Sequence, residues 1–261
     1  MKTSVLMLAA VVFATIVPSM NGQGQSQSNG CALLPSYSQL KTALATARTA
    51  ENSGLNAPEW ATIVDRDGTV CATAFTGNDR RSQLGIARIS SAMRANTANA
   101  FNNGGVALST ANLYSSTQPG GFVGGISYNY PVNQAALFSG QLDWLGTAFD
   151  PMLGQRVGGF VAVGGGLGLY GQGAAPLGGI GVAGDHSCTD HDVAWRVRNL
   201  LGLDHLAGFP PLSGDPSRPD NIVYDITPNP NGGIGNSASG LGHPACPNMA
   251  DPKKLPIVIV P

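Results

Sequence analysis

The chain has 261 residues, and its 14 Lys and Arg against 15 Asp and Glu give a formal net charge of −1. Charged residues make up 11% of the chain, where about 25% is usual, which excludes a basic nucleic-acid-binding surface and a disordered polyelectrolyte. The 36 Gly and 18 Pro beside 43% hydrophobic residues argue against a helical bundle and predict a compact domain rich in strands and turns.

The first apolar run predicts a secretion signal. Lys2 precedes a short apolar stretch, 5–17, which small and polar residues follow. This order is typical of a cleaved signal peptide, whereas a membrane anchor, the alternative, needs about 20 apolar residues. We therefore expect cleavage between residues 18 and 22, a secreted or periplasmic protein, and no transmembrane span.

The next segment predicts an amphipathic helix between residues 35 and 54, capped by Ser36 or Ser38 and ended by Gly54. Its apolar residues recur at helical spacing. They are Leu40, Ala43, Leu44, Ala47 and Ala50.

A β-hairpin is predicted over 61–75, where two apolar, β-branched runs flank Asp67 and Gly68, a dipeptide that supplies the positive φ angles of a tight turn. A second helix is expected over 83–101, and its many alanines would let it approach a sheet closely. The apolar positions of this helix are Ile86, Ile89, Met93 and Ala100.

The stretch 102–156 is turn-rich, with a short helix expected over 109–115 and a helix or strand over 135–144. Two glycine-loaded runs, 157–171 and 176–184, predict buried strands that other backbone or a flat ligand could approach closely. Their residues suited to buried strands are Phe160, Val161, Val163, Ile180 and Val182.

An apolar helix is predicted over 193–201, where Thr189 with Asp192 would form the cap and Gly202 would end the helix. Beyond Leu203, the sequence predicts a strand over 221–226 and a loose tail end whose IVIV run, 257–260, is an edge strand or no element. This order of elements, joined by tight hairpins, predicts a single α+β domain with a central, mostly antiparallel sheet flanked by helices.

All four cysteines lie after the expected signal, and an even number in an oxidising compartment predicts two disulfides. The preferred pairing joins Cys31 to Cys71, which ties the N-terminal arm to a strand, and Cys188 to Cys246, which ties the tail to the domain. Four cysteines allow three pairings, so the other two stay open.

Several motifs together carry a family resemblance. They are the hairpin IVDRDGTVCATAF, a helix ending in ANTANAF, the QPGG turn at 118–121, and GGFVAVGGGLGLYG followed by PLGGIGVAG and an acidic helix start at 190–192. In their order and spacing these motifs resemble the GlcG/HbpS-like family of haem-binding proteins over residues 34–202. The resemblance implies a sheet flanked by helices, homo-oligomeric assembly, and binding of haem or a related tetrapyrrole, and haem degradation and redox sensing are ascribed to some members.

The chain departs from the family pattern in the loop 184–192, which is rich in His and Asp, and in its C-terminal extension. We expect four segments. They are a signal peptide (1–22), an N-terminal arm (23–33), a GlcG/HbpS-like domain (34–203) and a Pro/Gly-rich C-terminal extension (204–261).

Candidate ligands come from the histidines, which all lie in the last third of the chain. Imidazole is a common metal ligand and a usual axial ligand of haem iron, so we expect His186 and His191, with Asp190, to hold haem or a divalent metal. If Cys188 pairs with Cys246, His243 is drawn toward this cluster. The alternative is that these residues are simply polar side chains that complement the N-terminus of a helix. For His205 and His243 a structural role is favoured.

The haem pocket is expected between the glycine-rich strands, the helix ending at Phe101 and the loop 185–191. Arg94, and with it Arg88, would contact haem propionates, although solvated helix arginines are the alternative.

The sequence thus favours a secreted or periplasmic haem-binding protein with a role in haem uptake, sensing or degradation. One alternative is a metal-assisted enzyme that acts on a small organic molecule through His186, His191 and Asp190. Another is a structural protein whose glycine-rich strands serve oligomer packing.

Overall fold

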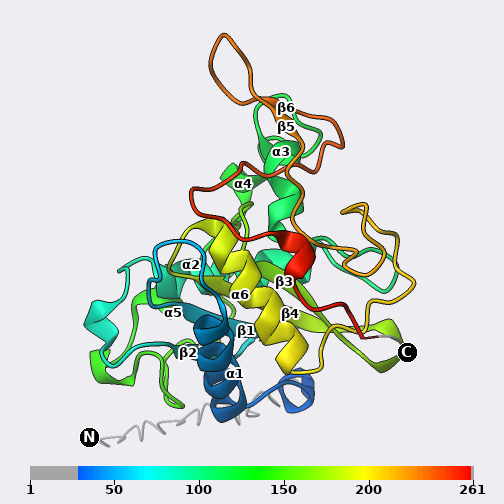
Figure 1. The fold of residues 1–261 in the computed structure, drawn as a ribbon. Coiled ribbons are helices and arrows are strands. Elements are labelled where there is room, and N and C mark those ends of the chain that lie inside the picture. The colour runs from blue at the N-terminus through cyan, green and yellow to red at the C-terminus, as the bar shows by residue number, and fades with distance from the viewer. Residues whose placement is uncertain (1–28, 260–261) are drawn as a thin grey trace, which may run out of the picture.

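A computed structural model describes residues 29–259, and the expected signal peptide lies outside the described residues (Figure 1). The strands are β1 (Trp60–Asp65), β2 (Val70–Phe75), β3 (Gly166–Gly171), β4 (Ala175–Ala183), β5 (Ile226–Thr227) and β6 (Asn236–Ser237). The α-helices are α1 (Tyr37–Ala50), α2 (Ala87–Ala100), α3 (Tyr114–Thr117), α4 (Ile126–Asn129), α5 (Gln134–Phe138) and α6 (Ser187–Leu200). The 3-10 helices are η1 (Asn29–Leu33), η2 (Arg80–Ser82), η3 (Thr110–Leu113), η4 (Leu142–Trp144), η5 (Gln172–Ala174) and η6 (Pro252–Lys254).

The central sheet has the strand order β2-β1-β4-β3, and every neighbouring pair is antiparallel. The predicted hairpin is confirmed, with Gly68 at φ +78° in its turn. Helix α1 begins at the predicted cap, because Ser36 accepts the N–H of Gln39 while the Gln39 side chain accepts the N–H of Ser36. The α+β class and the antiparallel sheet are therefore as the sequence predicts.

The two faces of the sheet carry different side chains. Ile180 and Val182 of β4 point into the main core, where they join residues of α1 and α6 such as Leu44 and Trp195. The intervening Gly179 and Gly181 face α2, and a Cβ atom on them would lie 2.3 Å from the Ala95 carbonyl oxygen and 2.0 Å from the Ser91 carbonyl oxygen. Helices α1 and α6 lie side by side on one face (Figure 1), and α2 packs on the other.

This close approach corrects the predicted buried face of the second helix. Ile86 is 69% exposed, whereas the small residues Ser91, Ala92 and Ala95 are fully buried against the sheet. Backbone in van der Waals contact leaves no room for large side chains, so the alanines and not the branched residues face the strands.

Four other predicted boundaries were wrong. The first glycine-rich run forms a strand only from Gly166, and α6 begins at Ser187 with His186 at its N-cap instead of after Thr189. Helix α1 already ends at Ala50, before Gly54. Of the strand expected over 221–226, only Ile226 is in a strand, paired with Ser237.

The tail end is not loose. Leu255 and Val258 are buried in the main core, and the indole N–H of Trp195 donates to the carbonyl of Pro256 over 2.9 Å. The backbone N–H groups of Val258 and Ile259 donate to other loops rather than to the central sheet. Apolar side chains of the extension thus complete the core above α6.

Both preferred disulfides are confirmed, with Cα atoms 5.2 Å apart for Cys31–Cys71 and 6.1 Å apart for Cys188–Cys246. Within residues 29–259, no helix is long and apolar enough to cross a bilayer.

Candidate functional site

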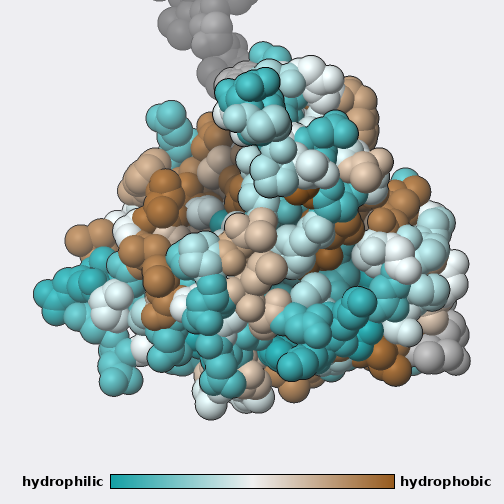
Figure 2. Space-filling view, turned by 45° about the horizontal axis from the view of Figure 1, so that its top comes forward, coloured by the Kyte–Doolittle hydropathy of each residue, from teal (hydrophilic) through white to brown (hydrophobic). Residues whose placement is uncertain are grey.

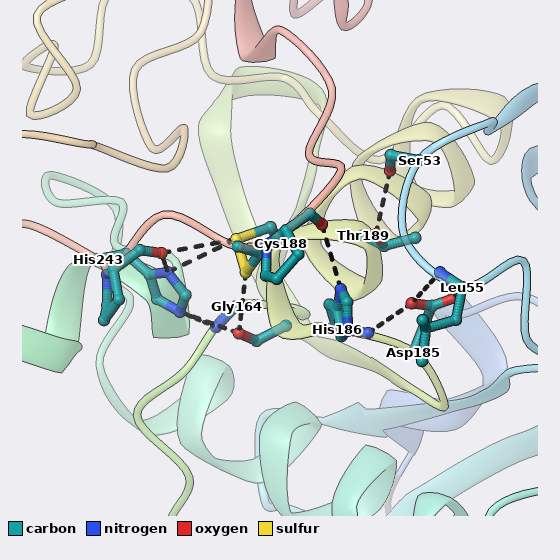
Figure 3. The surroundings of a disulfide bond; sticks show 12 residues. Ser53, Leu55, Gly164, Asp185, His186, Cys188, Thr189 and His243 are labelled. Carbon is teal, nitrogen blue, oxygen red and sulfur yellow. Dashed lines mark hydrogen bonds between the residues drawn. A yellow bond between two sulfur atoms is a disulfide. The ribbon is translucent and has the colours of Figure 1, made fainter.

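The turn from β4 into α6 carries the predicted site residue His186, and Cys188 follows in the first turn of α6 (Figure 3). The carboxylate of Asp185 accepts the backbone N–H groups of Leu55, Ala57 and His186 over 2.9, 2.9 and 2.7 Å. It therefore fixes the loop 51–58 against the start of α6. Gly184 fits between them, because a Cβ there would lie 2.4 Å from the Pro58 carbonyl oxygen.

Asp190 and Arg94 form a buried ion pair between α6 and α2, with Oδ2 and Nη1 2.5 Å apart. The other Asp190 oxygen accepts the Asp185 N–H over 2.8 Å, and Arg94 also donates to the Val182 carbonyl. Burial raises the pKa of Asp190 to about 6, against the opposing influence of Arg94. Both of these contacts use Nη1, so Arg94 is held by the protein before any haem propionate binds.

Arg88, the other predicted propionate contact, is similarly engaged. It holds Asp150 through two hydrogen bonds of 3.0 and 2.6 Å and donates to the Leu137 carbonyl over 2.7 Å. Such a fork is a strong structural pairing.

His191 belongs to the first turns of α6 and is fully buried. Its Nε2 lies 3.1 Å from Asn221 Oδ1, which also accepts the Ile222 N–H, so Nε2 carries the proton. Its Nδ1 is buried with no partner among residues 29–259. Burial lowers the pKa of His191 to about 4, and the ring is neutral near pH 7.

His243 lies next to the disulfide, as expected from the Cys188–Cys246 pairing (Figure 3). Its Nδ1 is 2.7 Å from the Pro244 carbonyl oxygen, and its Nε2 accepts the Gly164 N–H over 3.2 Å. Burial lowers its pKa to about 4. Both ring nitrogens are already used within the protein.

His186 differs from these two, because it is half-buried at the N-cap of α6. Its Nδ1 lies 3.3 Å from the Pro247 carbonyl oxygen, next to the disulfide-bonded Cys246. A carbonyl can only accept, so it favours the proton on Nδ1 and leaves a lone pair on Nε2. In the described part of the chain, no partner occupies Nε2.

The predicted metal ligands His186, Asp190 and His191 do not converge. Two sets of three potential ligands within 4.8 Å of one another occur in the described residues. They are Cys188, His243 and Cys246, and Cys31, Asp65 and Cys71. Each set contains a disulfide, and oxidised sulfurs are not the thiolates that bind metals.

Phe101 lies away from this turn, at the far end of α2. It contacts Phe160 at 5.7 Å between ring centroids, and Phe160 contacts Tyr130 at 6.1 Å. Seven residues separate it from Arg94, about 10 Å along a helix. Between the glycine-rich strand β4 and α2, where the haem pocket was expected, the two backbones are in direct contact.

The sequence missed a cavity of about 350 Å³, open to solvent, between α1, the loop 51–58 and the end of β2. Arg48 lines it, and Glu59 is fully buried nearby, with neither carboxyl oxygen bonded to a described residue. Burial, and next the charge of Asp190, raise the pKa of Glu59 well above its usual value. One signal was available, because Arg48 follows Leu40 and Leu44 at four-residue spacing on the buried face of the helix.

Comparison with known proteins identifies a family. A family model described as haem degrading protein HbpS-like matches residues 37–198, from the start of α1 almost to the end of α6. No curated protein matches the chain.

Solved structures are more distant. A PduOC–haem complex is 22% identical, covering 62% of this chain and 89% of that one, with a TM-score of 0.42. Klebsiella pneumoniae ORFY is 21% identical, covering 63% and 86%, with a TM-score of 0.41. A double mutant of Streptomyces reticuli HbpS is 17% identical, covering 75% and 99%, with a TM-score of 0.35. Likeness at this level supports no inference about the site.

Proposed function

The chain belongs to the family of HbpS-like haem degrading proteins, and from that premise we propose that it binds haem or a related tetrapyrrole. The family match over residues 37–198 carries this proposal. When bound, haem would supply a redox-active iron whose free coordination positions a protein side chain can fill.

His186 fits the iron ligand best. Histidines that bind metals usually donate the second ring N–H to a carbonyl or carboxylate, which orients the ring and fixes the tautomer. The contact between His186 Nδ1 and the Pro247 carbonyl has this form. His191 and His243 are buried, and the ring of His205 has no hydrogen-bond partner among the residues described.

We also propose that the protein works outside the cytoplasm after loss of residues 1–22. Two disulfides support this, because such bonds persist in oxidising compartments. In this proposal residues 34–203 form the family domain and 204–261 an extension that covers part of it. A role in haem uptake, sensing or degradation is the finer part of the proposal.

Homo-oligomeric assembly is the third part of the proposal. Four large apolar side chains of the segment 138–149 are exposed, namely Phe138, Leu142, Trp144 and Phe149. Apolar residues also interrupt the hydrophilic surface elsewhere (Figure 2). Exposed apolar patches commonly mark association surfaces. Light scattering of the mature protein would measure its mass in solution, and a mass above that of one chain is the result expected for a homo-oligomer.

Hemin titration monitored at the Soret band tests the haem proposal. We expect His186→Ala to alter the band and weaken hemin binding by about 10- to 100-fold, the usual effect of losing such a group. The substitution removes no helix cap, because the His186 side chain makes no capping hydrogen bond. His205→Ala is the matched control, also half-buried, and should leave the titration unchanged.

Two outcomes would count against the proposal. An unchanged titration of His186→Ala would mean that His186 is not the ligand. A wild-type protein that does not bind hemin would overturn the proposed function. The metal-assisted enzyme gains no support from the geometry, because its three residues do not converge.

A further inference from the structure

We propose that the cavity between α1, the loop 51–58 and β2 binds the carboxylate of an apolar ligand, with Arg48 and Lys41 as its recognition groups. This site is separate from His186 and uses none of the residues assigned to the haem iron. The proposal stands on the charge, the unused hydrogen bonds and the shape of this cavity.

The cavity is positively charged. Lys41 and Arg48 are seven residues apart on α1, so two helical turns place them on the same side of the helix. None of the described residues that line the cavity is acidic. The nearby carboxylate of Asp185 is already occupied by backbone N–H groups of the loop and of His186.

Arg48 has hydrogen-bonding capacity that the described chain does not use. The residue is 8% exposed, and Nη2 donates to Asn56 Oδ1 over 2.7 Å. Its Nε and Nη1 are buried and have no partner among residues 29–259. Buried guanidinium groups nearly always pair their N–H groups, and a carboxylate in this cavity would accept the Nη1 N–H together with the second N–H of Nη2.

Glu59 does not serve as that partner. It is fully buried near Arg48, yet neither of its carboxyl oxygens accepts a hydrogen bond from a described residue. Burial favours its protonated form, and it does not accept from the unused N–H groups of Arg48. An external carboxylate would supply the missing acceptor.

The loop that orients Arg48 is preorganised. Asn56 has φ +55°, a left-handed conformation that a residue with a Cβ rarely adopts. Asp185 accepts the N–H groups of Leu55 and Ala57, the neighbours of Asn56. The carbonyl of Asn248 accepts the Gly54 N–H, and the Asn248 side-chain amide donates to the Gly54 carbonyl. Asparagine tolerates this conformation better than other residues with a Cβ, and these contacts fix the loop that positions Arg48.

The shape of the cavity sets the ligand class. Ala45, Pro58 and Phe75 provide apolar walls beside the cations. A volume of about 350 Å³ lies at the lower end of the range for small-molecule sites, roughly 300–1,000 Å³. It suits a one-ring or short-chain carboxylic acid, whereas a porphyrin could place only a propionate arm there.

Benzoate tests the free acid, and hemin compared with hemin dimethyl ester tests the propionate arm. Chemical shifts of the mature protein would be followed during a benzoate titration, with benzamide as the neutral isostere. We expect benzoate to shift the resonances of Arg48 and Asn56 and Arg48→Gln to weaken binding at least tenfold, with benzamide leaving the spectrum unchanged. The control Arg156→Gln removes an exposed arginine outside the cavity and should bind as wild type does.

Two further variants keep the test decisive if Arg48→Gln unfolds. Lys41→Gln removes an exposed cation and should weaken benzoate binding severalfold, whereas Glu59→Gln should leave it unchanged. If Arg48→Gln weakens hemin but not its dimethyl ester, the propionate arm is the occupant, and if only benzoate is affected, a free acid is. Both results support the site.

The proposal is overturned if benzamide binds as tightly as benzoate. It is also overturned if the wild-type protein neither binds benzoate nor distinguishes hemin from its ester. In the latter case a Soret change that depends on His186 would leave the proposed haem function intact.

Discussion

Burial separates the histidines that one stretch of sequence groups together. His191 and His243 lie inside the protein, where desolvation lowers each pKa to about 4, while His186 keeps one nitrogen open at the surface. Because the pKa of each buried imidazole is lower in the folded protein than in the unfolded chain, it makes the free energy of unfolding depend on pH.

The first prediction concerns His191. Between pH 6.5 and 4 the unfolded chain protonates this residue and the folded protein does not, so its contribution to the free energy of unfolding falls as the pH is lowered. A shift from 6.5 to about 4 corresponds to about 3 kcal/mol. Urea unfolding of wild type and His191→Asn at several pH values would measure it.

The difference between the two proteins is the decisive quantity. Asp190 and Asp192 have pKa values raised by burial to about 6 and about 8, which makes their own contributions fall as the pH rises. Both proteins contain these carboxyls, so their effects cancel in the difference. A difference that stays constant between pH 4 and 6.5 would contradict the low pKa of His191.

At the scale of elements, the glycines of β4 allow the backbone of α2 to pack directly against the sheet. Gly181 has no space for a side chain, because a Cβ would also lie 2.5 Å from the Ala95 backbone nitrogen. The groups proposed above to bind ligands, His186 and Arg48, lie outside this face of the sheet.

We expect Gly181→Ala to lower the free energy of unfolding by about 1–3 kcal/mol or more, because the helix backbone must move away from β4. Chemical denaturation would show it. Gly85→Ala is the control, since a Cβ at that position meets no atom within 4 Å. Equal stability of the two variants would mean that α2 and the sheet are not in such close contact.

The extension contains a comparable pair of positions. Leu255 is 2% exposed in the main core, while Ile257, two residues later, is 58% exposed. Leu255→Ala should cost about 2–5 kcal/mol, the usual range for a buried leucine. Ile257→Ala should change the free energy of unfolding by about 0.5 kcal/mol or less. Thermal and urea unfolding of both variants would decide whether the tail belongs to the core.

At the scale of the whole molecule, the disulfide between Cys188 and Cys246 joins the extension to the start of α6 across 58 residues. Chain-entropy arguments assign about 4 kcal/mol to a loop of this length. The bond also keeps Pro247, the carbonyl partner of His186, in place.

We therefore expect the double variant Cys188→Ala, Cys246→Ser to unfold at lower guanidinium concentration, with a loss of about 2–4 kcal/mol. Cys31–Cys71 remains in this variant. The free energy of unfolding of both proteins would be measured with and without reductant. The loss that reductant causes in wild type but not in the variant is the contribution of the Cys188–Cys246 bond. If the variant were as stable as wild type, the extension would be held by packing alone.

The sequence by itself determined the α+β class, the hairpin, helices α1, α2 and α6, and the family resemblance. These features depend on local periodicity, turn residues and motif order, which a linear chain displays directly. The preferred disulfide pairing was also right, although only the fold brought each pair of Cα atoms to within 6.1 Å.

Only the tertiary structure decided which candidate residues are available to a ligand. Arg94 pairs with Asp190 because α2 and α6 come together at the C-terminal end of β4, and His191 is buried where Asn221 returns over α6. The cavity beside Arg48 likewise forms where α1, a loop and β2 converge. Whether a side chain is buried, and which group it bonds to, depends on contacts between segments distant in sequence, so residue type and spacing cannot determine it.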